Sequence, residues 1–353
     1  MVNYTLIMFG EIIDNLSLQI GMDLGSCSTL IYLKERGVVV EEPSVIARVK
    51  KRRWQKESRV LAVGIRAREM AEREPRGVEV VWPIKGGMVD DYRAMRVMMG
   101  EYLRAVYEVP VKGLVVLKPE AVVAVPGAMT DVQLRAVISI LTDLGVGRVV
   151  LVNAAVAAAA GSGMAVERFA GLVVDVGGGK TAVSVVSNGG VVVERSIGGG
   201  GISFDGAIGD YIKMKYGVLI GRMTAERIKI EAEKGKMVVR GRDLESGLPK
   251  SIMVGMGEVN EALSLELTKV VRTIRGVLDE APPEITNEVV RQGILLVGKG
   301  SQVSGLRAMI EGETKINCLP IEEAGSAVIR GVALMVEDNK LRRSIRSVSG
   351  YGY

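Results

Sequence analysis

Short apolar runs bounded by glycines alternate along the chain with longer segments that have helical character. The short runs are typical of buried strands. Two of the helical segments are TDVQLRAVISILTDLG (130–145) and FDGAIGDYIKMKYG (204–217). In the first, Thr130 is the expected N-cap and Gly145 the expected stop. The alternation predicts an α/β fold built from βαβ units.

One strand–turn–strand pattern occurs twice. LQIGMDLGSCSTLIYL (18–33) and GLVVDVGGGKTAVSVV (171–186) each place Asp-x-Gly-x-x-x-Thr between two apolar strands. The second copy ends in Gly-Lys-Thr like a nucleoside-triphosphatase P-loop, which needs a glycine five positions before its Gly-Lys pair. That position is Val174, inside an apolar run. The P-loop interpretation fails on spacing, and a duplicated hairpin replaces it.

Such a turn leaves backbone amides pointing inward, a nest suited to phosphate oxygens. Glycine permits the close approach, and an aspartate at the strand end suits a magnesium ion held through its waters. Two such hairpins facing each other would clamp a triphosphate from both sides. The alternative is ordinary hairpin geometry, since strand–turn–strand with glycine is common.

Composition narrows the class of protein. A length of 353 residues predicts two or more domains, and 48% hydrophobic with 25% charged residues is typical of a globular chain. Aromatic residues make up only 4% against 44 glycines, which disfavours stacking platforms for nucleic acid. We therefore expect no nucleic-acid partner.

The chain contains no histidine, which excludes Ser-His-Asp and Cys-His catalysis and histidine-ligated zinc. Its two cysteines, Cys27 and Cys318, form no metal-ligand or disulfide pattern. A reducing cytoplasm is the simpler interpretation.

The net charge of +5 is concentrated in two segments, 48–59 and 340–346. Either they are solvated faces or they contact anionic partners such as membrane headgroups. No apolar run reaches membrane-spanning length. Apolar residues from Val2 to Leu16 recur at helical spacing, which fits an interfacial helix or packing on the protein itself.

Several ordered segments resemble the MreB family of bacterial actins, and the paired hairpins are similar to the phosphate segments of the wider superfamily of actin, heat-shock-chaperone ATPases and sugar kinases. The MreB-like segments are GMDLGSCSTLIYL, EEPSV (41–45), VAVPGAMTDVQLRAV (123–137), DVGGGKTAVSVVS, YGVLIGRMTAERIKIE (216–231), VRGRDLESGLPK (239–250) and GILLVGKGSQVSGL (293–306). They follow the family's order and spacing over nearly the whole chain.

The resemblance implies an actin-like α/β fold. Two duplicated ribonuclease-H-like domains would each carry an inserted subdomain, with nucleotide in the cleft between them. The implied boundaries are 1–40, 86–160 and 322–345 for subdomain IA, 41–85 for IB, 161–195 and 260–321 for IIA, and 196–259 for IIB, with a flexible basic tail at 346–353.

The resemblance also implies binding of ATP or ADP with Mg²⁺, the ion being held through water by Asp23 and Asp175. The implied phosphate-binding residues are Ser26, Cys27, Ser28, Thr29, Gly177, Gly178, Gly179, Lys180 and Thr181. The implied nucleoside-binding residues are Glu226, Arg227, Lys229, Gly298, Lys299, Gly300 and Ser301. Glu226 and Lys229 could instead form a surface ion pair, and the 298–301 turn could be a loop without a ligand.

The departures from the family concern hydrolysis. MreB proteins carry a Glu-Glu-Pro segment whose second glutamate orients the attacking water, and this chain has Asn153 and Ala154 at the two glutamate positions. An amide cannot accept the proton of that water at neutral pH. Lys180 and Ala182 replace a threonine and a glutamate, and Gly201-Ile202-Ser203 stands where the family has an acidic residue. We expect nucleotide binding with weak ATPase activity and no confident catalytic residue.

The implied function is a filament-forming protein of cell shape or shape-change motility. It would assemble with itself as antiparallel pairs of protofilaments, or with MreB paralogues, in the cytoplasm or on the inner face of the membrane. A sugar or acetate kinase of the same superfamily is the alternative, but no carboxylate base for such a substrate is evident. A chaperone-type ATPase would need a further substrate-binding region.

Overall fold

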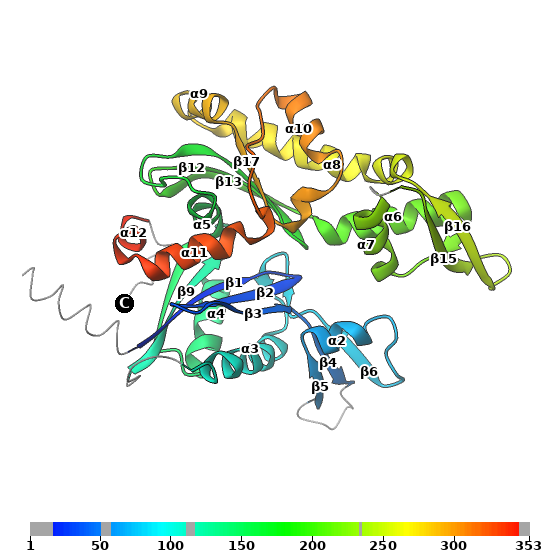
Figure 1. Cartoon of the computed structure of the whole chain (residues 1–353), viewed down its shortest axis with the longest axis horizontal. Coiled ribbons are helices and arrows are strands. Elements are labelled where there is room, and N and C mark those ends of the chain that lie inside the picture. Colours follow the sequence, from blue (N-terminus) through cyan, green and yellow to red (C-terminus); the bar gives the residue numbers. More distant parts are fainter. Residues whose placement is uncertain (1–16, 51–57, 111–116, 233–234, 346–353) are drawn as a thin grey trace, which may run out of the picture. The chain divides into compact units, whose positions relative to one another are not determined.

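The computed structural model describes residues 17–50, 58–110, 117–232 and 235–345 (Figure 1). They form two compact units. Of the described residues, unit 1 comprises those within 17–169, 188–191 and 326–345, and unit 2 comprises those within 170–187 and 192–325. The N-terminal apolar stripe, most of the basic segment 48–59 and the tail 346–353 lie outside the described residues. No helix in the described ranges is long and apolar enough to cross a bilayer.

Unit 1 is built on a five-stranded sheet in the order β10-β9-β1-β2-β3. β1 runs antiparallel to β2 and parallel to β9, which is parallel to β10. The strands are β1 (Ser17–Leu24), β2 (Ser28–Leu33), β3 (Gly37–Pro43), β9 (Leu117–Val125) and β10 (Arg148–Asn153).

Helices cover both faces of this sheet. Ile20 and Met22 of β1 lie in one core with α3 (Tyr92–Tyr107) and α4 (Asp131–Asp143). Gly21, between them, faces α11 (Ala327–Glu337), which packs on α5 (Ala154–Gly161). The middle of β1 is therefore buried on both faces of the sheet, although Gln19 and Asp23 interrupt its apolar residues.

Both expected ends of α4 are confirmed. Thr130 caps the helix in a reciprocal box with Gln133, whose side chain accepts a hydrogen bond from the Thr130 amide at 2.9 Å. Gly145 follows the helix with φ +96°, a conformation that favours glycine. The capping residues therefore fix the length of this helix, as its sequence predicts.

A smaller three-stranded sheet, ordered β5-β4-β6, projects from unit 1 with helix α2 against it. A two-stranded ribbon and a final helix complete the unit. These elements are β4 (Ile46–Val49), β5 (Val60–Val63), α2 (Ile65–Met70), β6 (Val78–Val81), β7 (Ile84–Lys85), β8 (Met88–Val89) and α12 (Asn339–Ser344).

Unit 2 repeats the plan of unit 1. Its main sheet has the order β13-β12-β11-β17, with β11 antiparallel to β12 and parallel to β17. Cys318 forms a parallel bridge with Ile294 at the outer edge of β17, where unit 1 has its fifth strand. The strands are β11 (Ala170–Val176), β12 (Lys180–Ser187), β13 (Gly190–Gly198) and β17 (Ile294–Val297). The matching strand order confirms the predicted α/β class and the duplication.

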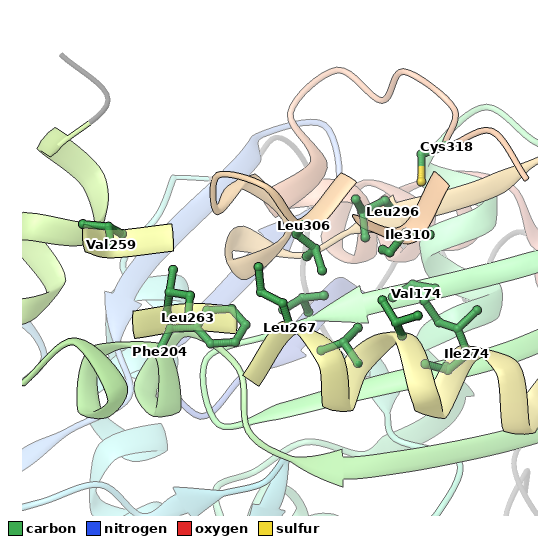
Figure 2. Close-up of a cluster of buried hydrophobic side chains, with 14 of the residues drawn as sticks. Val174, Phe204, Val259, Leu263, Leu267, Ile274, Leu296, Leu306, Ile310 and Cys318 are labelled. Atoms are coloured by element: carbon green, nitrogen blue, oxygen red, sulfur yellow. The ribbon is translucent and has the colours of Figure 1, made fainter. Parts of the chain in front are cut away.

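The core of unit 2 lies between this sheet and long helices. Figure 2 shows Val174 of β11 beside Ile274 of α8, Leu296 of β17 beside Ile310 of α10, and Phe204 of α6 beside Leu263 of α8. The helices are α6 (Gly201–Tyr216), α7 (Arg222–Glu231), α8 (Met256–Glu280), α9 (Pro283–Gln292) and α10 (Leu306–Thr314). A small sheet, β14 (Val218–Leu219), β15 (Met237–Asp243) and β16 (Pro249–Val254), extends from α6 and α7.

Helices α5 and α11 approach so closely that glycine is required at their contact. A Cβ added to Gly331 would lie 1.7 Å from the carbonyl oxygen of Ala157, and one added to Gly161 would lie 1.9 Å from that of Ala327. These atoms are backbone, so the helices would have to separate to admit a side chain.

We expect Gly331→Ala to lower the free energy of unfolding by about 1–3 kcal/mol or more, the usual cost of overpacking. Thermal unfolding followed by circular dichroism would measure the shift. Gly312→Ala is the matched control, since Gly312 lies within α10 and a Cβ there meets no atom within 4 Å. The control should gain up to about 1 kcal/mol from helix propensity. Equal stability of both variants would contradict the close contact.

Candidate functional site

The two duplicated hairpins have the same register. Asp23 lies opposite Leu30 in the first, and Asp175 lies opposite Ala182 in the second, a separation of seven positions in both. Each aspartate is the next-to-last residue of its strand, two positions before the glycine of the turn. The structure thus places the two predicted magnesium-holding carboxylates at equivalent points of units 1 and 2.

The turns of the hairpins also share a hydrogen bond. The amide of Gly25 donates to Ser28 O at 3.1 Å, and that of Gly177 donates to Lys180 O at 3.0 Å. A Cβ at either glycine would crowd the same carbonyl, at 2.7 Å and 3.2 Å respectively. The Asp-x-Gly spacing therefore encodes a specific tight turn.

Ser44 supports the first turn from behind. Its hydroxyl donates to Gly25 O at 2.6 Å, so the bond of 2.8 Å between Thr29 Oγ1 and Ser44 Oγ has Thr29 as donor. The Ser44 amide donates to Cys27 O, and the Gly87 amide donates to Ser26 Oγ. Thr29 is fully buried and therefore holds the turn. Ser44 was not among the predicted residues, although it lies in the family-like segment EEPSV.

The second turn is held by the start of α6. The carbonyls of Gly177 and Gly178 accept hydrogen bonds from the amides of Gly201 and Ile202 at 2.9 and 2.8 Å. The Gly179 carbonyl accepts from Gly199. Thr181, also fully buried, donates its hydroxyl to Gly199 O at 3.0 Å.

The amides of the same turn stay available. Within the described residues, neither Gly178 nor Gly179 donates its amide to a protein acceptor. A Cβ on Gly200 would lie 2.3 Å from Gly177 O, so a larger residue there would push into the turn. The carbonyl oxygens of this turn are hydrogen-bonded to protein amides, whereas the amides of Gly178 and Gly179 can still donate to a ligand. This arrangement is what an anion-binding nest requires.

Charged side chains flank the second turn. Burial raises the pKa of the Asp175 carboxyl to about 6, with Lys180 opposing the shift and Glu194 adding to it. Burial lowers the pKa of the Lys180 ammonium, while Glu194 and Asp175 oppose that change. Lys180 thus interacts electrostatically with both carboxylates and brings a positive charge to this turn.

Lys229 of α7 connects to the turn through α6. Its Nζ lies 2.6 Å from Asp205 Oδ1 and donates to Gly201 O at 3.0 Å. Asp205 is 3% exposed, and burial raises the pKa of its carboxyl while Lys229 opposes the shift. The buried ion pair fixes α7 beside the amides that hold the glycine turn. Asp205 was not predicted, because its pairing across two helices leaves no local sequence signal.

The 298–301 turn packs directly on the second hairpin. Gly298 has φ +87°, and a Cβ there would lie 2.5 Å from Asp175 Oδ1. A Cβ on Gly300 would lie 2.8 Å from Val176 O. Ser301 is buried and donates its hydroxyl to Gly298 O at 2.7 Å. The two glycines let this segment, which leads into the short 3-10 helix Lys299–Gln302, lie against Asp175.

Unit 2 therefore gathers most of the residues predicted for it. The hairpin, the start of α6, Lys229 and the 298–301 turn form one contiguous group. Glu226 is half-buried on α7, whereas Arg227 and Lys299 are exposed. The residues of the first hairpin form a separate group in unit 1. The roles assigned to all of these side chains stay predictions.

The junction of β10 and α5 places Asn153 and Ala154 at the start of a helix. Asn153 is buried, and its Oδ1 accepts a hydrogen bond from the Ala155 amide at 2.7 Å, so it is the N-cap of α5. Ala154 is the first helical residue and is half-buried. The Asn153 amide accepts no proton from water at neutral pH, and alanine offers no base.

Comparisons with known proteins agree with this arrangement. The model of the MreB/Mbl protein family matches residues 17–344. The cell shape-determining protein Mbl of Bacillus subtilis is 35% identical over 327 residues, covering 90% of this chain and 96% of the relative. The crystal structure of MreB 5 of Spiroplasma citri bound to AMPPNP is 26% identical with a TM-score of 0.83, covering 93% and 97% of the two chains. The structure of the same protein bound to ADP is 25% identical with a TM-score of 0.85, covering 93% and 98%.

Proposed function

Because the chain belongs to the MreB/Mbl family, we propose that it is an ATP-binding bacterial actin that forms filaments and hydrolyses ATP slowly. The observation that carries this proposal is the second hairpin, whose carbonyls are held by α6 while two glycine amides remain open. The relative that is 35% identical, Mbl of Bacillus subtilis, is a cell shape-determining protein, which supports a cytoskeletal role. The AMPPNP and ADP complexes of the similar Spiroplasma protein support nucleotide as the ligand.

The residues present fit a nucleotide with magnesium. The turn of Gly177–Gly179 offers amides for phosphate oxygens, and Lys180 adds a positive charge. Asp23 and Asp175 occupy equivalent positions in the two hairpins, and a carboxylate at the end of a strand suits an ion held through its waters. Bound Mg²⁺ would neutralise phosphate charge. No cluster of three potential metal ligands occurs in the described ranges, and ligation through water needs none.

Slow hydrolysis follows from the β10–α5 junction. Asn153 is committed to capping the helix, and Ala154 has no proton acceptor. A well-placed general base typically contributes about 10²–10⁴-fold in rate. Nucleotide would therefore act chiefly as a structural ligand whose turnover is slow.

The proposed assembly is a filament of identical subunits, paired as antiparallel protofilaments. MreB paralogues are further partners in this proposal, with a role in cell shape or shape-change motility. The proposed location is the cytoplasm, including the inner face of the cell membrane. The family relationship supports the proposed assembly, role and location. The proposal includes no nucleic-acid partner.

Electron microscopy of the purified protein with and without ATP, paired with a phosphate-release assay, tests the proposal. We expect filaments that depend on ATP and magnesium, with phosphate released slowly. Absence of both binding and filaments would contradict the proposal. Rapid transfer of the γ-phosphoryl group of ATP to an added sugar or acetate, with formation of ADP, would identify a kinase instead.

Membrane contact through the basic segment 340–346 makes a separate prediction. Arg342 forms an ion pair with Glu120 in which both side chains are about 10% exposed, so it is not available to lipid. Lys340 and Arg343 of α12 are exposed. We expect Lys340→Gln/Arg343→Gln to reduce pelleting with anionic vesicles by about fivefold for each charge removed, because each basic residue contributes about 1 kcal/mol at such a surface. Equal pelleting of wild type and variant would remove this segment from the membrane hypothesis.

A further inference from the structure

A groove runs along the surface of unit 2 between α6 and α8. Its volume is about 430 Å³, and α6 lines it with residues at helical spacing, Ser203, Gly206, Ala207, Asp210, Tyr211 and Met214. A Cβ added to Gly206 would meet no atom within 4 Å, so the space beside this residue is open. Phe204, by contrast, is buried against Leu263 of α8 (Figure 2). The groove therefore lies on the outside of a close-packed pair of helices.

Two large apolar side chains line this groove. Met214 of α6 is 79% exposed, and Leu265 of α8 is 66% exposed. The solvent side of a surface helix is normally polar, and covering apolar surface is favourable by about 25 cal/mol per Å². Methionine also adapts its shape to a bound apolar residue. Both side chains therefore favour a partner that brings apolar residues of its own.

The charged side chains that line the groove are all acidic. They are Asp210, Glu261 and Glu266, and no lysine or arginine of the described residues lines it. Glu261 accepts a hydrogen bond from the Tyr211 hydroxyl at 2.6 Å, and Glu266 pairs with Lys269. Asp210 forms no hydrogen bond or ion pair with another described residue. The groove is thus negative on a chain whose net charge is +5, and its charge is complementary to a basic partner.

The length and the walls of the groove suit a short helix. The α6 residues that line it run from Ser203 to Met214, which is about three turns, or about 16 Å at about 1.5 Å per residue. Both walls are helices, whose backbone hydrogen bonds are satisfied internally, so the groove offers no strand edge to an extended peptide. Amphipathic helices bind in grooves through apolar residues at positions i, i+3, i+4 and i+7.

We infer that this groove binds a basic amphipathic helix of a partner protein. The apolar face of that helix would cover Met214 and Leu265, while lysines or arginines beside this face would approach Asp210 and the two glutamates. The contact is separate from the proposed nucleotide site and from filament growth, because it requires neither ATP nor a second copy of the chain. It makes unit 2 a docking surface for another protein.

Synthetic peptides test the groove with the full chain in the absence of nucleotide. The probe is a fluorescein-labelled peptide of about 14 leucines and lysines, with leucine at i, i+3, i+4 and i+7. One control peptide has the same composition in an order that forms no apolar face, and a second replaces every lysine with glutamate. We expect the probe to bind at least about tenfold more tightly than either control, measured by fluorescence anisotropy, because it alone matches both the apolar residues and the charge of the groove. Equal binding of all three peptides, or no binding of the probe, would overturn the inference.

A substitution in α6 locates the binding site. Gly206→Arg fills the groove and adds a positive charge, so it should weaken binding of the probe at least about tenfold, since like charges across an interface are unfavourable. Gly209→Arg is the matched control, because Gly209 lies on the same helix, does not line the groove, and a Cβ there also meets no atom within 4 Å. The control should bind the probe as wild type does. Circular dichroism should show both variants folded, since each glycine has room for a side chain.

Two results with these variants would overturn the inference. One is binding of the probe by Gly206→Arg as tightly as by wild type, or equal loss of binding in both variants, because either would place the peptide elsewhere. The other comes from sedimentation velocity without nucleotide or peptide. Self-association of the wild type that Gly206→Arg abolishes and Gly209→Arg retains would assign the groove to a second copy of the chain.

Discussion

Replacing Ala154 with glutamate is expected to raise the rate of phosphate release by about 10²–10⁴-fold, the usual contribution of a positioned general base. Proteins of the family carry a glutamate at this position, and no other side chain at the β10–α5 junction supplies a proton acceptor. Asn153 lies next to it, but its Oδ1 is held by the Ala155 amide. A carboxylate at position 154 would restore a proton acceptor for the attacking water.

The local structure should tolerate this substitution. Ala154 is the first residue of α5, where a carboxylate is favoured by the helix dipole. The residue is half-buried, and the cap supplied by Asn153 does not depend on the Ala154 side chain. Ala154→Gln is the matched control, because it has almost the same shape but cannot accept the proton. Only the glutamate variant should turn over faster in a phosphate-release assay.

If Ala154→Glu does not raise the rate of phosphate release, Lys180 is the residue to test next. Its ammonium lies near the carboxylates of Asp175 and Glu194. Charge that stabilises bound phosphate lowers no barrier unless the contact strengthens in the transition state. If the Ala154→Glu variant still releases phosphate slowly, the double variant Ala154→Glu/Lys180→Thr should release it faster. Wild-type turnover already as fast as that of a glutamate-bearing relative would instead show that the junction is misaligned.

Local features of this fold can be read from the sequence. The register of both hairpins follows from the Asp-x-Gly-x-x-x-Thr spacing, because a tight turn fixes which residues pair. The ends of α4 follow from Thr130 and Gly145, which act through bonds within a few residues. These predictions succeed because each depends on a short stretch of chain.

Features that depend on contacts between distant segments could not be read in this way. The ion pair of Asp205 with Lys229 joins two helices, and the glycine requirement at Gly331 arises from the approach of α5. The pairing of Arg342 with Glu120 neutralises one of the four basic residues that the sequence shows in segment 340–346. In each case the chemistry of a side chain is set by a partner far along the chain.

Substitution of Asp175 by asparagine is expected to abolish magnesium-dependent ATP binding in calorimetry. The carboxylate lies at the strand end beside the glycine turn, where it is proposed to hold the hydrated ion. Asparagine keeps the shape but lacks the charge that attracts a divalent cation. Asp210→Asn, an exposed change on α6, is the control and should bind as wild type does. Unchanged binding by the Asp175 variant would contradict the assignment of this hairpin.

The same substitution should make the nucleotide-free protein more stable. Burial raises the pKa of Asp175 to about 6, whereas an unfolded aspartate titrates near pH 3.9. The folded state therefore carries an unfavourable ionised group above pH 6, and this cost disappears as pH falls below about 4. We expect Asp175→Asn to gain about 1–3 kcal/mol in urea unfolding at pH 8, from a shift of about two pKa units, and little at pH 4. Lower stability of the variant at pH 8 would show that Lys180 and the turn outweigh burial. A gain in stability with loss of binding would identify Asp175 as a residue retained for its ligand.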